Sequence, residues 1–114
     1  MAGKARLDEM YPMEYSINVI EIRETASYAK WFRDLRDGRA KAKINARIRR
    51  LSLGNPGDVK SVGSGVKEMR IDYGPGYRVY FDQRVEEIVI LLAGGDKKTQ
   101  TKDIARAIEL ARRL

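Results

Sequence analysis

The stretch that decides the fold is Val66–Asp82, with the sequence VKEMRIDYGPGYRVYFD. Apolar and polar residues alternate on both sides of Gly74–Gly76, a pattern that is typical of two strands joined by a tight turn. If these three residues form the loop, Ile71 lies opposite Val79 and one face of the hairpin is entirely apolar. We therefore predict an antiparallel hairpin with one dry face and one polar face.

The polar face of this hairpin is the candidate functional surface. In the predicted register it faces solvent and carries Glu68, Arg70, Arg78 and Tyr80. An arginine binds phosphate through paired hydrogen bonds, and a tyrosine stacks on a base or donates its hydroxyl. The residue types on this face therefore predict a binding site for a phosphate-bearing ligand.

The length and charge of the chain indicate one basic domain. A chain of 114 residues supports a single hydrophobic core, and we assign residues 14–114 to it. Residues 1–13 have no apolar periodicity, and we predict a flexible arm or an expression remnant there. Lys and Arg number 23 against 16 acidic residues, giving a net charge of +7. This balance favours an anionic partner, nucleic acid first, and a solubilising basic surface is the alternative.

Several kinds of site are excluded by what the sequence lacks. Cysteine and histidine are both absent, which excludes disulfides, the common zinc sites and the usual nucleophile–histidine mechanisms. The glycine-containing segments fit neither a dinucleotide fingerprint nor a P-loop, so we predict no cofactor. For the hairpin acids, ion pairs with nearby arginines are favoured over a metal site. We see no signal peptide and no apolar run long enough to span a membrane, so we expect a cytoplasmic protein.

Outside the hairpin, the apolar periodicity predicts an α+β domain. The expected elements are a first strand at Tyr15–Ile22, a helix after Thr25, a second helix at Arg39–Leu53, a last strand at Glu87–Leu92 and a C-terminal helix after Thr101. The first two helices should pack as a helical hairpin on one side of a small, curved, mostly antiparallel sheet. The opposite face would then be an open groove. We expect Asn55–Gly65 to be a turn-rich connection.

The second predicted helix is strongly basic. It has no acidic residue between positions 39 and 53, and its surface holds Arg39, Lys41, Lys43, Arg47, Arg49 and Arg50. Cations that repel one another on one helix favour an anionic ligand or an acidic partner. A merely solvated face accounts for them equally well, so both interpretations stand at this point.

The groove and its rim could bind and cleave RNA without histidine. The predicted rim residues are Lys60, Lys98, Gln100, Arg47 and Arg50. The 2′-hydroxyl of RNA attacks the adjacent phosphorus itself, and cations stabilise the extra negative charge. A lysine crowded by arginines, or Glu68, can act as the base. Such a site gains from a partner that holds the RNA in line for attack.

Residues between Gly57 and Ile104 also match a known family pattern. They are Gly57-Asp58, Lys60, Val62-Gly63, Gly65-Val66, Glu68, Arg70-Ile71, Gly74, Gly76–Phe81, Leu91-Leu92, Gly94–Lys97, Gln100 and Asp103-Ile104. This pattern, which spans about residues 15–113, resembles the RelE/ParE toxin superfamily. Within that superfamily it is most similar to the HigB-like addiction-module killer proteins.

The resemblance implies a RelE-like fold and a metal-independent, ribosome-dependent endoribonuclease that cleaves mRNA. It implies that Arg78 contacts the scissile phosphate and that Arg70 and Lys97 are catalytic cations. RelE-type enzymes carry a C-terminal tyrosine where this chain has Thr101–Asp103, and Tyr80 is the candidate replacement. The implied partners are the ribosome, mRNA and a HigA-like helix-turn-helix antitoxin whose acidic residues cover the groove or the basic helix.

Two other functions stay open on the sequence. One is a ParE-like inhibitor of DNA gyrase, which would act by protein–protein contact and have no nuclease activity. The fold alone does not distinguish these branches. The other is a basic nucleic-acid-binding module without toxicity, for which we expect a salt-sensitive affinity for RNA without turnover.

Overall fold

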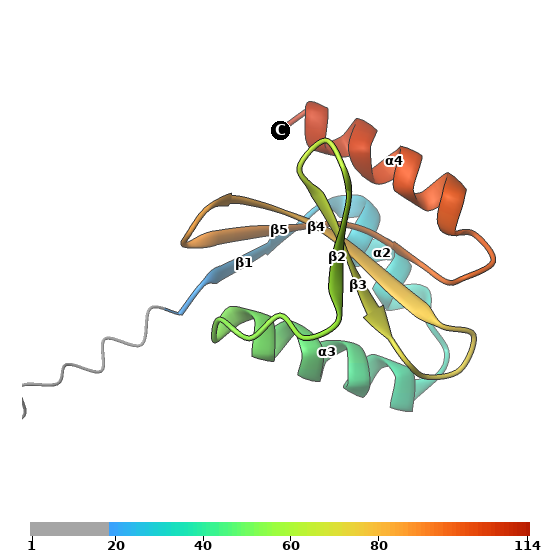
Figure 1. Cartoon of the computed structure of the whole chain (residues 1–114). Helices are drawn as coiled ribbons and strands as arrows, with labels where there is room; N and C mark the ends of the chain where they lie inside the picture. Colours follow the sequence, from blue (N-terminus) through green and yellow to red (C-terminus); the bar gives the residue numbers. More distant parts are fainter. Residues whose placement is uncertain (1–18) are drawn as a thin grey trace, which may run out of the picture.

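The computed structural model describes residues 19–114, which form a five-stranded sheet with helices on both of its faces (Figure 1). The elements in chain order are β1 (Glu21–Glu24), α2 (Ala26–Asp34), α3 (Gly38–Ser52), β2 (Val59–Gly63), β3 (Val66–Ile71), β4 (Tyr77–Val85), β5 (Ile88–Gly95) and α4 (Gln100–Arg112). The predicted arm and the first part of the predicted strand Tyr15–Ile22 lie outside the described residues. None of these three helices combines the length and the apolar character that a membrane span requires.

The sheet is mixed because its first strand runs parallel to its neighbour. The strand order is β1-β5-β4-β3-β2, and only the β1–β5 pair is parallel within this sheet. Thr25 joins the end of β1 to α2. Its hydroxyl donates to the Leu92 carbonyl at 2.6 Å and accepts from the Tyr28 amide at 3.1 Å. The second contact confirms Thr25 as the predicted N-cap of this helix.

The central hairpin keeps its predicted faces but has a different register. Ile71 pairs with Tyr77, so the connection is Asp72–Gly76 and the predicted three-residue loop was wrong. Two loop glycines adopt left-handed φ values of 58° and 80°, which suits a wider turn. A shift of two residues leaves each side chain on its face, because the side-chain period of a strand is two. The new register places Arg70 directly opposite Arg78.

The apolar face of the hairpin packs against α2 and α3. The cluster of buried residues formed by this face, the two helices and β5 consists of Tyr28, Ile44, Leu51, Met69, Ile71, Val79, Phe81, Val89 and Leu91. The Trp31 ring lies flat on β5, where a Cβ added to Gly94 would be 2.1 Å from it. Glycine is therefore required at position 94, and Trp31 is a half-buried residue of α2 that packs against the core.

The polar face of the hairpin does not face solvent, because α4 covers it (Figure 1). Ala107 and Ala111 of α4 are buried in one cluster with Tyr80. Glu68 and Tyr80 are both 0% exposed. The prediction of an open groove on this face was therefore wrong. The alternation of residues within the strands carries no information about where the last helix packs. The small alanines of α4 allow this helix to approach the sheet closely.

The predicted helical hairpin, and with it the RelE-like architecture, was also wrong. The domain is α+β, but α2 packs on β5 and α3 on β3, with few contacts between the two helices. Asp37 starts α3 separately, because its carboxylate accepts from the backbone amides of Arg39 and Ala40. These two helices lie side by side on one face without forming a hairpin pair, and α4 covers the other face of a sheet that dominates the fold. Periodicity identifies the apolar side of each helix but not the strand against which it packs.

Two smaller predictions also need correction. The connection Asn55–Gly65 contains the strand β2, which pairs with β3 and places Lys60 opposite Glu68. This strand is short and is followed by a glycine-containing turn, so its sequence shows no alternation long enough to predict a strand. The last helix begins at Gln100 rather than after Thr101.

Candidate functional site

Three cationic side chains converge at one end of the sheet. They line a cleft of about 390 Å³ whose residues are Asp58, Arg70, Ile71, Asp72, Gly76, Arg78 and Lys97. Arg70 comes from β3, Arg78 from β4, and Lys97 from the loop that follows β5. These are the three cations to which the sequence analysis gave catalytic roles, and the fold brings them together in one concave site.

The β3–β4 loop brings its backbone close to these cations. A Cβ added to Gly76 would lie 3.5 Å from both the Nη1 atom of Arg78 and the Cβ of Lys97. The Nη1 atom of Arg78 also donates to the Gly76 carbonyl at 3.3 Å. Because Arg70 and Arg78 are direct cross-strand neighbours with like charge, each requires a compensating negative group.

A buried carboxylate lies beneath Arg78. Glu68 Oε1 is 3.7 Å from Arg78 Nε, and Glu68 Oε2 accepts a hydrogen bond of 2.8 Å from Gln100 Nε2. The Arg78 side chain is only 11% exposed. A charge buried to this degree is stable only when it is paired. Glu68 therefore orients Arg78 from below and does not line the cleft in which a ligand would lie.

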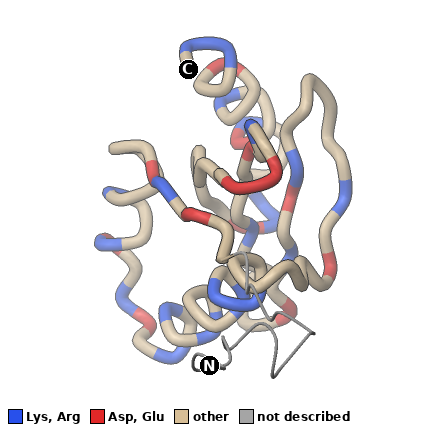
Figure 2. The backbone as a smooth tube through the Cα atoms, turned by 90° about the vertical axis from the view of Figure 1, so that its left-hand side faces the viewer, with Lys and Arg blue, Asp and Glu red and all other residues tan. Residues whose placement is uncertain are grey.

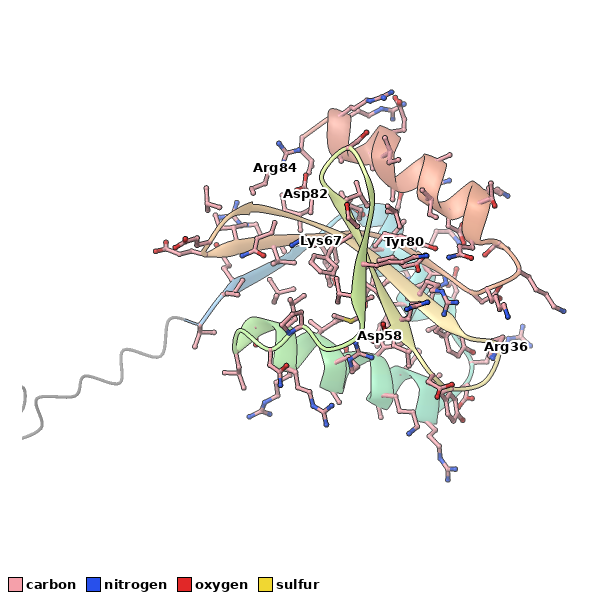
Figure 3. The ribbon with its side chains drawn as sticks, viewed as in Figure 1. Arg36, Asp58, Lys67, Tyr80, Asp82 and Arg84 are labelled. Atoms are coloured by element: carbon pink, nitrogen blue, oxygen red, sulfur yellow. The ribbon has the colours of Figure 1, made fainter. Side chains whose placement is uncertain are left out.

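Tyr80 lies on β4 (Figure 3) and is the direct cross-strand partner of Glu68. Burial, and secondly the neighbouring charge of Glu68, raises the pKa of the Tyr80 hydroxyl well above its usual value of 10.0. The hydroxyl lies near Glu68 but makes no hydrogen bond of regular geometry. A neutral, buried phenol is not accessible for stacking on a base or for accepting a proton from a ligand.

Arg70 is paired with Asp58, which precedes β2 beside α3 (Figure 3). Arg70 Nη2 lies 3.1 Å from Asp58 Oδ1, and the two side chains are 40% and 56% exposed. An exposed pair of this kind contributes little to stability, so a ligand phosphate can take the place of Asp58. Neither Asp58 nor Asp72 was predicted from the sequence as a cleft residue. No periodicity points to Asp58, which reaches the cleft through the β2–β3 register.

The charges of the cleft are almost balanced. Arg70, Arg78 and Lys97 are offset by Asp58 and Asp72 in the cleft and by Glu68 beneath it. Within residues 19–114, no group of three or more acidic side chains is arranged to hold a metal ion. The arrangement is suited to an anion that competes with Asp58 for the arginines.

The predicted rim residues around α4 do not line the cleft. Lys60 is exposed on β2, and Lys98 is exposed in the loop before α4, where its amide donates to the Asp96 carboxylate at 2.9 Å. Gln100 is bonded to Glu68 and so supports the buried network. Of these residues, Lys60 and Lys98 have exposed cationic side chains that can meet an anion.

The predicted rim residues of α3 have different surroundings. Arg47 Nη1 donates to the Arg70 carbonyl at 2.6 Å, and its Nη2 donates to the Pro56 carbonyl at 3.2 Å. Arg47 therefore holds β3 and the segment before β2 against α3. Arg50 is exposed and lines a neighbouring hollow of about 270 Å³. Its side chain is available to a ligand.

Comparison of the sequence with known proteins identifies the family of this chain. Residues 30–114 match the family model described as phage derived protein Gp49-like (DUF891). This phage-derived, toxin-like family is distinct from the RelE/ParE superfamily, so the assignment drawn from sequence resemblance was wrong. The resemblance rested on short glycine- and arginine-containing segments, which do not define a family by themselves.

One relative is found in Haemophilus influenzae (strain ATCC 51907 / DSM 11121 / KW20 / Rd), where it is described as an uncharacterized protein. It is 55% identical over 95 residues, which covers 83% of this chain and 96% of the relative. No solved structure matches this chain.

Proposed function

Since the chain belongs to the phage-derived Gp49-like family, we propose that it is a toxin that cleaves mRNA on the ribosome. The observation that carries this proposal is the convergence of Arg70, Arg78 and Lys97 in one cleft. RNA cleavage builds negative charge on the phosphate, and cations already held in position stabilise that charge without reorganisation. The proposed enzyme is an endoribonuclease that needs neither a metal nor a cofactor.

The proposed reaction uses the RNA as its own nucleophile. The 2′-oxygen forms a bond to the adjacent phosphorus while the bond to the 5′-oxygen breaks, which yields a 2′,3′-cyclic phosphate and a 5′-hydroxyl end. Arg78, held by Glu68 from below, is suited to bind the non-bridging oxygens. Arg70 adds a second guanidinium once the phosphate has displaced Asp58.

Two protons must move in this reaction. Glu68 and Tyr80 are buried, so we assign the proton of the 2′-hydroxyl to Asp72, the cleft carboxylate for which no ion pair is found among the described residues. The ammonium of Lys97 gives a proton to the departing 5′-oxygen. A carboxylate is a weak base, so the reaction depends on a ribosome that aligns the message for attack. The proposed place of action is therefore the cytoplasm.

The test is induction of the chain in a bacterial host with mapping of mRNA 5′ ends. We expect new ends inside translated reading frames and none in untranslated transcripts. Arg78→Ala should lower cleavage by roughly 100-fold or more, and Arg70→Ala by less. Arg23→Ala is the matched control, because Arg23 is an exposed strand arginine outside the cleft. Retained cleavage by a folded Arg78→Ala protein would contradict the assignment of the site.

Intact messages accompanied by DNA breaks would contradict the nuclease and point to a gyrase inhibitor. We further propose that a protein encoded beside this chain neutralises it by placing acidic side chains in the cleft. Binding of that protein should compete with RNA and weaken with Arg70→Ala. An isolated gene would count against such a partner.

A further inference from the structure

Two more hollows continue from the cleft onto the surface of α3. The first, of about 270 Å³, shares Ile71 and Asp72 with the cleft. The second, of about 540 Å³, shares Lys43 and Ala46 with the first. The depressions therefore form one path around the end of the sheet. We name the two hollows on α3 together the α3 track.

We propose that the α3 track binds the single-stranded RNA that continues from the scissile phosphate, and that it supplies most of the affinity for the substrate. The identity of the ligand as RNA rests on the proposed function. The path starts where the cleft ends, at Asp72, so a strand whose phosphate occupies the cleft can enter the track without crossing another element.

The charges favour this division between cleft and track. The cleft cations are offset by carboxylates, whereas the track is lined by Arg39, Lys43, Arg47 and Arg50 against the single carboxylate of Asp72. Binding of a polyanion gains free energy when cations release counterions from its phosphates. The unbalanced cations of the track can supply this gain, and the balanced cleft cannot.

The lining of the track suits RNA better than a protein. Protein interfaces depend on large anchors in an apolar surround, but among the described residues the track has no large exposed aliphatic side chain: its aliphatic lining is Ala42, Ala46 and the buried Ile71, and its other residues are charged apart from Tyr73. Within residues 19–114 the large apolar side chains that are exposed lie elsewhere and do not line the track. They are Val19, Leu53, Val85 and Leu114.

The one aromatic ring of the track belongs to Tyr73. Its hydroxyl donates to Asp37 Oδ2 at 2.9 Å, and the Lys43 ammonium lies 5.3 Å from its ring centre. The ring is half-buried and held in place, with the Lys43 ammonium over one of its faces. When that ammonium turns to a phosphate, the ring face becomes open to a base. An aromatic ring next to a cation is the usual combination for stacking a base of a single strand.

The test compares binding of short and long RNA to the full chain. The probes are fluorescent 2′-O-methyl oligouridylates, a trinucleotide and a dodecanucleotide, which cannot be cleaved by attack of the 2′-oxygen. We expect the longer probe to bind far more tightly. The double variant Lys43→Gln/Arg50→Gln should weaken its binding roughly tenfold at about 50 mM salt. It should also lower the salt slope by about 0.7 for each phosphate that the variant no longer neutralises.

The matched control is Arg112→Gln/Arg113→Gln at the far end of α4. It removes the same charge from two exposed positions outside the track, the last residue of α4 and its C-cap. This control is needed because basic residues are spread over much of the domain (Figure 2). We expect it to leave the affinity for the dodecanucleotide within about twofold, and thermal melts should show that both variants are folded.

Three results would overturn the proposal. They are equal affinity for the two probes, equal weakening in the track variant and its control, and binding of polyglutamate that depends on Lys43 and Arg50 without a preference for longer RNA. The last result would assign the surface to an acidic protein. Because the readout is binding, these results are independent of whether Arg78→Ala abolishes cleavage. Failure of the track and failure of the nuclease are thus distinguishable.

Discussion

The two faces of the sheet use the same strands in different ways. On the α2/α3 face, large apolar side chains such as Phe81, Met69 and Ile44 fill a continuous core. On the α4 face, alanines of the helix lie over the strands, and the buried set includes Glu68 and Tyr80. The first face stabilises the domain, whereas the second also positions Arg78 in the cleft. A buried polar residue at a site's edge is informative because apolar packing does not explain it.

The largest expected effect tests the apolar face. Phe81→Ala removes a side chain that is 1% exposed and leaves a cavity between the sheet and the helices. We expect the free energy of unfolding to fall by about 3–5 kcal/mol in urea titrations. Val85→Ala on the same strand is the control, because Val85 is 55% exposed and should cost within about 0.5 kcal/mol. Similar losses at the two positions would show that this face is not the main core.

The next effect tests the buried carboxylate of the α4 face. Glu68→Ala leaves the Arg78 guanidinium largely buried without its counter-charge, and we expect a loss of about 3 kcal/mol in the free energy of unfolding. Glu68→Gln keeps the size and removes the charge, so it separates pairing from packing. If the glutamine variant is as stable as the parent, the charge of Glu68 does not hold Arg78 and the contrast between the faces weakens.

The sequence predicts the apolar face better than the α4 face for a physical reason. Alternation in Val66–Asp82 identifies which side chains share a face, and this survives a register shift of two residues. Whether the other face is covered depends on where α4 packs, and alternation within the strands carries no information about that. Asp58 illustrates the same limit, because its place in the cleft follows from the pairing of β2 with β3, and the segment that contains β2 was predicted as a turn-rich connection.

The three cations of the cleft could be found from sequence for a different reason. Each lies near a turn or a strand end: Arg78 comes just after the β3–β4 loop, and Lys97 comes just after β5. Residues at strand ends gather at one edge of a sheet whatever the exact register. Their grouping was therefore accessible, while the buried support of Arg78 by Glu68 and Gln100 was not.

A smaller effect tests the link between α4 and the cleft. Gln100→Ala removes the hydrogen bond to Glu68, and we expect the free energy of unfolding to fall by about 1 kcal/mol. Thr101→Ala is the control in the same helical turn, since Thr101 is exposed. If Gln100 supports Arg78, mRNA cleavage should fall in the Gln100 variant and not in the control. Equal cleavage by both would limit Gln100 to a structural role.

The smallest effect at neutral pH concerns a buried phenol on each face, Tyr28 and Tyr80. Neither hydroxyl has a regular hydrogen-bond partner among the described residues, and burial raises the pKa of both above the usual 10.0. Tyr28→Phe and Tyr80→Phe should therefore change stability little near pH 7.

Above pH 10 the unfolded chain loses these protons while the folded chain keeps them, so the parent should lose stability by up to about 1.4 kcal/mol per pH unit for each phenol. Urea titrations at rising pH should show a shallower fall in either variant. Glu68→Gln with Tyr80 retained separates burial from charge, because it removes the neighbouring charge and keeps the phenol: the fall above pH 10 should become shallower than in the parent but not vanish. An unchanged fall in Tyr80→Phe would mean that the α4 face admits water.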